Sequence, residues 1–328
     1  GILALSGSYT TAGLGALVND GSGVIQLGGV LGSGMLDNRS ATFTLNGTTG
    51  TLNLNGGTIE GGTVRGLGGA GLTVASTGTL DGVTLDADVL AAGSGVRLTA
   101  RNGLTLAGGH RVLVNGSNSN AILNFTGGSQ TLGGSGEVVF GGSFSHTSML
   151  SADLDAGETL TIGSGMTIRV GAAGQGGVIQ ANSAIVNQGS IIADASGQSL
   201  SLIGNGFSNA GTLSAQSGGI LALSGSYTTA GLGALVNDGS GVIQLGGVLG
   251  SGMLDNRSAT FTLNGTTGTL NLNGGTIEGG TVRGLDGAEL AVLSTGALDA
   301  VTLDADAAVA NATTLVVRNG LTLANGHR

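Results

Sequence analysis

Apolar residues recur along the chain in short triplets, in which they alternate with polar or small residues. Such triplets lie at 52–54 (LNL), 72–74 (LTV), 104–106 (LTL), 160–162 (LTI), 200–202 (LSL) and 221–223 (LAL). A period of two is the pattern of a β-strand with one buried face. GG, NG, DG and SG pairs lie between the triplets, and their glycines supply the positive φ angles of tight turns. The pattern therefore predicts many short strands joined by tight turns.

Helices are not expected, because glycine costs about 1 kcal/mol per helical site relative to alanine and glycine interrupts every candidate stripe. An antiparallel sandwich or propeller is an alternative, but aromatic residues make up only 2% of the chain. In the most regular places, such as 52 to 72 and 200 to 221, the triplets recur at a spacing of about 20 residues, the length of one solenoid coil. Small aliphatic triplets at this spacing suit a narrow core in which each coil stacks like residues over like. We expect an all-β, right-handed parallel β-helix (β-solenoid) with about 20 residues per coil, right-handed winding being the rule for parallel crossovers.

A long internal repeat defines the organisation of the chain. Residues 1–67 recur without a change at 219–285, an offset of 218, and residues 68–111 recur with substitutions and one deletion at 286–328. We therefore divide the chain into a first repeat unit, 1–218, of about 11 coils at about 20 residues each, and the first half of a second copy, 219–328, continuous with the same solenoid. This arrangement predicts a segment of a longer array.

Composition supports a folded chain and excludes several protein classes. The 89 Leu, Ile, Val and Phe residues, about 27% of the 328, exceed the roughly 20% below which cores fail. The absence of Pro, together with glycine that has no three-residue period, excludes collagen. The absence of Cys excludes a disulfide scaffold, a zinc finger, an iron–sulfur site and a thiol enzyme.

Charge and hydropathy exclude further partners. The net charge of −9 argues against nucleic acid, whose phosphates need a basic face. No apolar run reaches the roughly 18 residues that a membrane span requires. All ten basic residues are Arg, so a P-loop or Schiff-base lysine is missing, and we expect no cofactor. No signal peptide begins at Gly1, so any targeting segment is expected outside this chain.

Paired carboxylates are the first candidates for chemistry. Asp86 and Asp88 lie two residues apart, as do their copies Asp304 and Asp306, which places them on one side of a strand about 6.5 to 7 Å apart. This spacing would suit an inverting glycosidase pair, but a solvated strand face or a turn edge is the favoured interpretation, because no ring of Arg, Tyr or Trp that would hold a sugar follows the pair. We therefore expect no catalytic residues, and Asp86 and Asp88 remain the alternative.

Other polar clusters point to weaker sites. A second acidic cluster at 153–158 (DLDAGE) could bind a surface cation, but the nonapeptide pattern of calcium rolls is not repeated in series. Ser145, His146 and Asp153 lack the strand–turn–helix setting of a hydrolase nucleophile. We accordingly expect no metal site.

Asparagine and histidine are expected to shape the coil corners. Asparagine side chains can stack in ladders, one coil above the next, and the Gly-His-Arg motif survives in both copies where its neighbours have changed. The predicted turn and ladder residues are Asn53, Asn55, Asn102, Asn187, His110 and His327.

Several segments resemble the repeats of large bacterial surface proteins. They include TLNLNGGTIEGGTVRG (51–66), STGTLDGVTL (76–85), SQTLGGSGEVVFGG (129–142), TLTIGSGMTIRVG (159–171) and NQGSIIADASGQSLSL (187–202). The strings are similar to those of filamentous-haemagglutinin-like adhesins and autotransporter passengers, which are β-strand-repeat proteins. The resemblance covers the whole chain and rests on rhythm. It implies an extracellular right-handed β-helix that serves as a stalk, fibre or adhesive surface.

These observations favour a structural protein and not an enzyme. The expected function is that of an extracellular, cell-surface fibre or adhesin segment acting in surface attachment, cell–cell contact or a biofilm matrix. Its expected partners are further copies, associated end to end and laterally, and possible surface glycans. The alternatives are a polysaccharide-active β-helix enzyme, either a lyase or a hydrolase, and a glycan-binding module.

Overall fold

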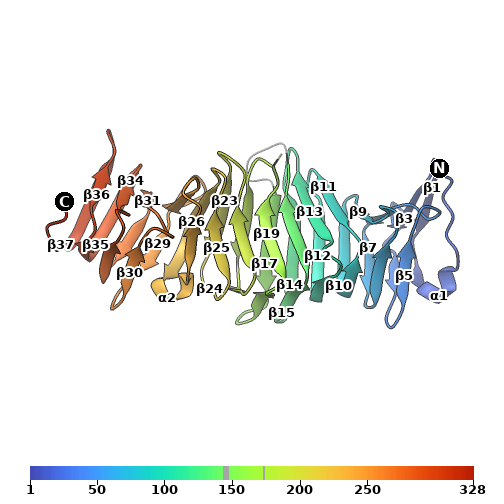
Figure 1. Cartoon of the computed structure of the whole chain (residues 1–328). Coiled ribbons are helices and arrows are strands. Elements are labelled where there is room, and N and C mark those ends of the chain that lie inside the picture. Colours follow the sequence, from blue (N-terminus) through green and yellow to red (C-terminus); the bar gives the residue numbers. More distant parts are fainter. Residues whose placement is uncertain (143–147, 173) are drawn as a thin grey trace. The chain divides into compact units, whose positions relative to one another are not determined.

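The computed structural model describes residues 1–142, 148–172 and 174–328 and consists of parallel strands that stack coil upon coil (Figure 1). Strands make up 59% of the chain and helices 2%. The predicted all-β, parallel β-solenoid is confirmed, and the described residues form about 14 turns. Two compact units are distinguished, residues 1–177 and 178–328.

Three parallel rows of strands form the sides of the coil in unit 1. The first row is an ordered sheet of β1 (Ile2–Leu5), β3 (Val24–Gly28), β6 (Leu52–Asn55), β9 (Leu72–Val74), β11 (Val89–Gly93), β13 (Arg111–Gly116), β16 (Gly136–Phe140) and β19 (Met166–Val170). The second row is β2 (Ser8–Thr10), β4 (Met35–Asp37), β7 (Gly57–Glu60), β10 (Thr77–Asp86), β12 (Arg97–Leu106), β14 (Ala121–Gly127) and β17 (Ser148–Leu154). The third row is β5 (Thr42–Leu45), β8 (Thr63–Gly66), the second halves of β10 and β12, β15 (Gln130–Gly134) and β18 (Thr159–Ile162).

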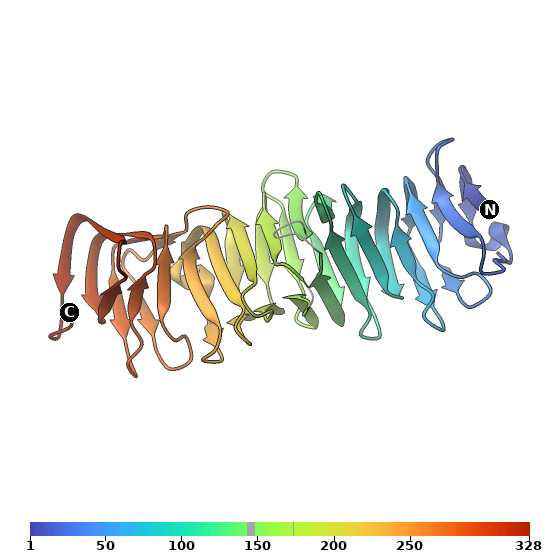
Figure 2. The same cartoon turned by 90° about the horizontal axis from the view of Figure 1, so that it is seen from above.

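Unit 2 follows the same plan. One row is β20 (Gly177–Ala181), β23 (Ser199–Gly204), β26 (Ile220–Thr228), β28 (Val242–Gly246), β31 (Leu270–Asn273), β34 (Leu290–Val292) and β36 (Ala307–Val309). A second contains β21 (Ala184–Asn187) with β24 (Phe207–Asn209), and the end of β26 with β29 (Met253–Asp255), β32 (Thr276–Glu278), β35 (Thr295–Asp304) and β37 (Thr314–Leu323). The remaining strands are β22 (Ser190–Ala193), β25 (Thr212–Ala215), β27 (Leu235–Asn237), β30 (Thr260–Leu263) and β33 (Thr281–Gly284). Seen from above, the strands of each unit again lie side by side (Figure 2).

Coil length varies because the corner loops differ in their number of residues, while the strand rows remain aligned from coil to coil. The coil that aligns Leu72 with Val89 is short, whereas the coil that aligns Gly136 with Met166 is much longer. The predicted coil of about 20 residues lies between these two lengths. Corner loops absorb the extra residues, so strands can remain in register while sequence spacing changes.

The core is narrow and aliphatic, as the triplets predicted. Leu52 and Leu54 are 2% and 0% exposed, while Asn53 between them is half-buried on the outer face. Phe125 and Phe140 are the largest fully buried side chains. Alternation along each strand thus places one small aliphatic side chain per coil directly above another.

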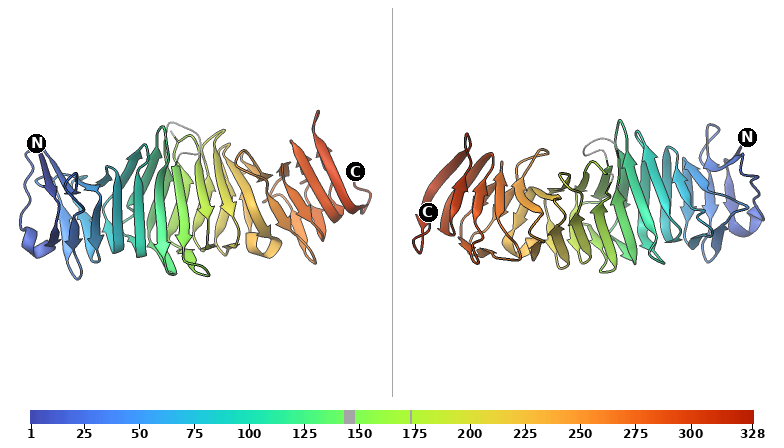
Figure 3. Two further views of the ribbon diagram at one scale, coloured as in Figure 1. Left: turned by 180° about the vertical axis from the view of Figure 1, so that it is seen from behind. Right: turned by 45° about the horizontal axis from the view of Figure 1, so that its top comes forward.

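Two single-turn helices are the exceptions to the all-β prediction. They are α1 (Thr11–Leu14), beside the first strands of unit 1, and α2 (Thr229–Leu232), which has strands of unit 2 on both sides of it along the stack (Figure 3). The hydroxyls of Thr10 and Thr228 cap them by accepting hydrogen bonds from Gly13 N and Gly231 N at 3.0 and 2.9 Å. Both turns occupy corners and leave the strand rows intact.

The repeat boundary predicted at 218/219 lies inside unit 2. There β23 pairs with β26 over six residues, from Ser199 with Ile220 to Gly204 with Gly225. The first strand of the second copy therefore continues the backbone ladder of the coil before it. The division of the chain into compact units at 177/178 is a separate feature from the sequence repeat.

Glycine is required by geometry at Gly62. Its φ is +63°, and an added Cβ would lie 2.0 Å from the carbonyl oxygen of Asn38. Gly68 has nearly the same φ, +65°, but a Cβ there would meet no atom within 4 Å. Alanine at Gly68 would therefore introduce backbone strain alone, whereas alanine at Gly62 would introduce both backbone strain and steric overlap.

We expect Gly62→Ala to lower the unfolding free energy of unit 1 by about 3 kcal/mol, of which about 1–2 kcal/mol is the left-handed backbone term and the remainder disruption of buried hydrogen bonds at Asn38. The matched variant Gly68→Ala should lose only the backbone term. Urea unfolding followed by circular dichroism measures both. Equal losses in the two variants would show that the corner around Asn38 can rearrange to accept the added methyl group without a further loss of unfolding free energy.

Candidate functional site

The structure brings the candidate carboxylates together with a histidine from the next coil. Asp86 ends β10, and Asp88 lies just before β11, with the buried Ala87 between them. His110 lies at the turn between β12 and β13, where its Nδ1 is 2.9 Å from Asp88 Oδ1 and its Nε2 is 3.7 Å from Asp86 Oδ1. Arg65 Nε, from the preceding coil, is 3.0 Å from Asp86 Oδ2. We call these residues, together with Arg111, the carboxylate–histidine cluster.

The second copy contains the same cluster. His327 lies 3.3 Å from Asp306 and 3.7 Å from Asp304, and Arg283 is 3.1 Å from Asp304. Asn325 adds a hydrogen bond to Asp304 at 2.6 Å. That bond is the largest influence on the pKa of Asp304, which it lowers together with Arg283.

The positive and hydrogen-bonding groups around the aspartates of the cluster make these carboxyls poor proton donors. Burial acts to raise the pKa of the Asp88 carboxyl, but the hydrogen bonds from the His110 ring and the Arg111 backbone N–H, together with the electrostatic effect of these two side chains, outweigh it. The pKa of Asp88 therefore lies below its ordinary value. A glycosidase general acid needs a raised pKa. The cluster instead links three successive coils, through Arg65, then Asp86 and Asp88, then His110 and Arg111.

The predicted asparagine ladder has one member in a buried row. Asn187 is fully buried and donates to Asn209 Oδ1 at 2.7 Å, one coil further on, and Asn209 in turn donates to Leu232 O at 3.0 Å. These contacts satisfy polar groups that would otherwise be buried without partners. The row thus joins three successive corners of unit 2.

The other predicted ladder residues lie on the outer surface. Asn53 is aligned with Gln26 and Thr73, and Asn55 with Gly28. Asn102 has a φ of +54° and donates to Asp81 Oδ1 at 2.6 Å, so its cross-coil partner is an aspartate. The ladder-type contact at this position is therefore Asn over Asp.

Buried corner asparagines that we did not predict are Asn209, described above, and Asn38 with its copy Asn256, both of which are 0% exposed. Asn38 accepts from Thr11 Oγ1 at 2.7 Å and donates to Gly61 O and Thr63 O at 3.2 and 3.0 Å. Each of the four buried corner asparagines follows an inward apolar residue by two positions, whereas Asn124, which is buried within β14, does not. The pairs are Leu36 and Asn38, Ile185 and Asn187, Phe207 and Asn209, and Leu254 and Asn256.

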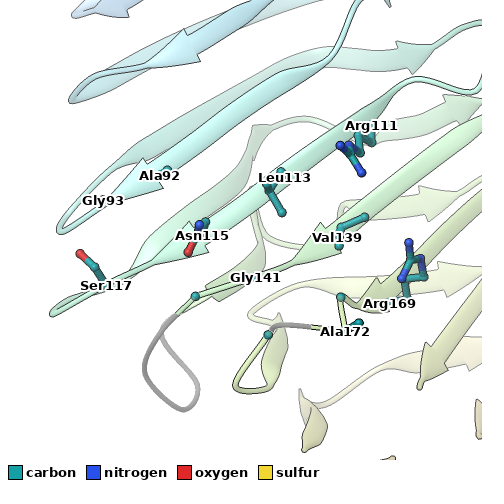
Figure 4. A pocket seen from close by; sticks show the side chains of 13 residues that line it. Ala92, Gly93, Arg111, Leu113, Asn115, Ser117, Val139, Gly141, Arg169 and Ala172 are labelled. Carbon is teal, nitrogen blue, oxygen red and sulfur yellow. The ribbon is translucent and has the colours of Figure 1, made fainter. Parts of the chain in front are cut away.

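A shallow groove of about 750 Å³ crosses the first sheet of unit 1 (Figure 4). Its floor is Leu113 and Val139, with Arg111 and Arg169 at one end and Asn115 at the other. Arg169 Nε is 2.7 Å from Glu137, and Arg111 Nε is 3.7 Å from Asp88. Both guanidinium groups already have carboxylate partners, so the apolar floor is the groove's distinctive chemistry.

The remaining candidates do not form a site in the part of the chain that the structure describes. Glu158 accepts hydrogen bonds from the backbone N–H and the hydroxyl of Ser129, which lower the pKa of its carboxyl. Within residues 1–142, 148–172 and 174–328, no group of three or more His, Asp or Glu side chains could hold a metal ion. Ser145 and His146 lie outside the described residues. Among those residues, no helix has the length and apolarity that crossing a bilayer requires.

Comparison of the chain with protein-family models, with curated proteins and with solved structures finds no match.

We expect His110→Ala to raise the pKa of Asp88, because burial then acts against fewer compensating contacts. Carboxyl-carbon NMR titration measures this value, and Asp306 in the second copy, whose His327 is intact, provides the control within the same molecule. Since the folded-state pKa of Asp88 is lowered, its stabilising contribution is present above the unfolded-state pKa and is lost as pH falls through the lowered value. The stability difference between wild type and variant should accordingly shrink in strong acid. An unchanged Asp88 titration would contradict the contact with His110.

Proposed function

We propose that this chain is a segment of a structural extracellular fibre or adhesin, built from tandem 218-residue β-solenoid units and acting at the cell surface in attachment, cell–cell contact or a biofilm matrix. The main support for this proposal is the stacking of the repeated sequence. The same 67-residue sequence occurs twice, and in its second position it is stacked on the coils that precede it. Such stacking is the interaction that a tandem array needs at every junction.

The exposed fractions of equivalent side chains in the two copies show how much surface the second copy buries against the coils that precede it. Leu3 is 48% exposed, whereas its copy Leu221 is 0% exposed. Leu14 is half-buried, whereas its copy Leu232 is 1% exposed. Because the two sequences are identical, the added burial comes from the coils formed by residues 178–218.

Specific contacts accompany the burial. Tyr227 is 3% exposed, and its hydroxyl donates to Leu202 O at 2.8 Å, while its ring meets that of Phe207 edge to face at 6.3 Å. Its copy Tyr9 is only half-buried. A buried Tyr hydroxyl with a backbone partner one coil away is the kind of contact that fixes register as well as affinity.

The alternatives draw less support from the geometry. A polysaccharide-active enzyme would use Asp86 and Asp88, but Arg65, His110 and Arg111 already contact these carboxylates. A glycan-binding module would use the groove, whose two Arg side chains are likewise paired. A mechanical and steric role requires neither site.

We expect concatemers of the 218-residue unit to form thin filaments whose length grows by a constant increment of about 45 Å per unit. The chain has about 14 turns in 328 residues, so 218 residues make about 9 turns and not the 11 expected from the sequence, and stacked strands lie about 4.8 Å apart. Electron microscopy of one-, two- and three-unit chains measures the increment. Compact particles, or a length independent of unit number, would refute the fibre. Labelling of intact source cells with an antibody against the chain tests the surface location separately.

The junction itself predicts a large difference between two identical substitutions. Leu221→Ala should lower the unfolding free energy by about 2–4 kcal/mol, as for other buried leucines. Leu3→Ala, in the same sequence without the covering coil, should change it by only about 0.5 kcal/mol. Urea unfolding of the two variants provides the comparison. Similar losses in both would mean that stacking on residues 178–218 contributes little to the second copy.

A further inference from the structure

Nine asparagines of the chain are followed directly by glycine. They are Asn46, Asn55, Asn102, Asn115, Asn205, Asn264, Asn273, Asn319 and Asn325. In an Asn-Gly pair the backbone nitrogen of the glycine can attack the side-chain amide carbon of the asparagine, because glycine has no Cβ to block the approach. The attack requires both the glycine N–H and the asparagine amide to leave any hydrogen bond they make. Hydrogen bonds to either group therefore protect the pair.

At five of the nine pairs a hydrogen bond holds the glycine nitrogen. The bonds run from Gly56 N to Thr77 O (2.7 Å), from Gly274 N to Thr295 O (2.9 Å), from Gly116 N to Ser148 Oγ (3.0 Å), from Gly103 N to Gln130 Oε1 (3.2 Å) and from Gly265 N to Asp286 Oδ2 (3.4 Å). Each bond joins the glycine to a residue of a neighbouring coil. The stacking of coils thus also restrains these five nitrogens chemically.

At three further pairs a hydrogen bond holds the asparagine side chain. Asn46 Oδ1 accepts from Thr48 N at 2.8 Å, which turns the amide toward the next residues of its own loop. The other two side chains donate from Nδ2 to carboxylates of the preceding coil, Asn319 to Asp299 at 2.7 Å and Asn325 to Asp304 at 2.6 Å. In these pairs the amide carbon cannot rotate toward the glycine nitrogen without the loss of that bond.

Asn205 is the exception in the part of the chain that the structure describes. It lies with Gly206 at the corner between β23 and β24, and both residues are exposed. Among the described residues, neither the Asn205 amide nor the Gly206 nitrogen makes a hydrogen bond. Gly206 contributes only its carbonyl oxygen, which accepts from Ile185 N at 3.2 Å. Both reacting groups of this pair are therefore unrestrained.

From this difference we propose that Asn205 is a site of spontaneous deamidation in the folded protein. The Gly206 nitrogen bonds to Cγ of Asn205, the Cγ–Nδ2 bond breaks, and ammonia leaves with the proton that the glycine nitrogen loses. Water then opens the resulting succinimide at either carbonyl, which gives aspartate or isoaspartate at position 205. Water is the only co-reactant. The proposal concerns a modification of the chain and does not depend on the proposed function.

The reaction changes the corner in two ways. Both products carry a carboxylate where the chain had a neutral amide, and isoaspartate also brings the side-chain carbon into the backbone. The corner leads directly into Phe207, which is 7% exposed and whose ring meets that of Tyr227. Isoaspartate at position 205 therefore lengthens the connection between β23 and a packed aromatic pair.

Incubation of the full chain in mildly alkaline buffer, followed by peptide mapping with mass spectrometry, tests the proposal. In the folded chain Asn205 should be converted at least about fivefold faster than Asn55, Asn102, Asn115 and Asn273, because one hydrogen bond of about 1 kcal/mol corresponds to a factor of about five. In urea, where the protecting bonds are lost, these rates should lie close together. Conversion of Asn205 in the folded chain at the rate of the four protected pairs overturns the proposal.

Two serine variants test the physical reason for the selectivity. Ser148→Ala removes the acceptor of Gly116 N and should raise the rate at Asn115 in the folded chain by about fivefold. The matched variant Ser214→Ala, at another buried serine, should leave the rate at Asn115 unchanged. Asn205→Gln should remove the product at position 205, since glutamine would have to close a larger ring. An unchanged rate at Asn115 in Ser148→Ala, with the fold intact by circular dichroism, overturns the argument that selects Asn205.

Discussion

The structure depends on in-register hydrogen bonding between the backbones of successive coils. A parallel strand leaves a row of unpaired N–H and C=O groups on each edge, and in this fold the next coil pairs with that row. The pairing of Ile2 with Val24, and of Ile25 with Leu52, continues the ladder strand by strand in the first sheet of unit 1. Because every coil both caps one neighbour and is capped by another, stability is a sum of junctions, as in other repeat proteins. No single centre holds the fold together.

Side chains at the corners further restrict the register in which successive coils pair. A parallel ladder alone tolerates slippage by two residues, since the inward face is preserved. Buried asparagines remove that freedom, because Asn38 reaches the carbonyls of Gly61 and Thr63 only in one register. Asn187 and Asn209 do the same in unit 2. The aliphatic core thus drives stacking, and the corner amides select how the coils align.

The sequence was sufficient to predict the strands and their stacking, because both follow from local patterns. Alternation identifies the inward residues Leu52 and Leu54 directly, and glycine pairs identify the corners. Coil length was less predictable, since loops such as residues 29–34, between β3 and β4, add residues to a corner without adding a strand. The buried role of Asn38 was missed because asparagine is common in exposed turns. Its position two residues after the inward Leu36 does not identify it alone, since the exposed Asn102 follows the buried Ala100 in the same way. The one-turn helices were missed because four residues leave no periodicity to detect.

The candidate site shows why cross-coil chemistry is harder to predict than the fold. Asp86 and Asp88 are close in sequence, and their spacing was sufficient to place them together. Their partners Arg65 and His110 each lie a full coil away along the chain, one before the carboxylates and one after them. Such partners can be identified only when each coil length is known, and those lengths differ widely between the short coils and the long ones. In this solenoid, therefore, the lengths of the corner loops determine which side chains of neighbouring coils meet at the surface, whereas the core pattern is the same in short and long coils.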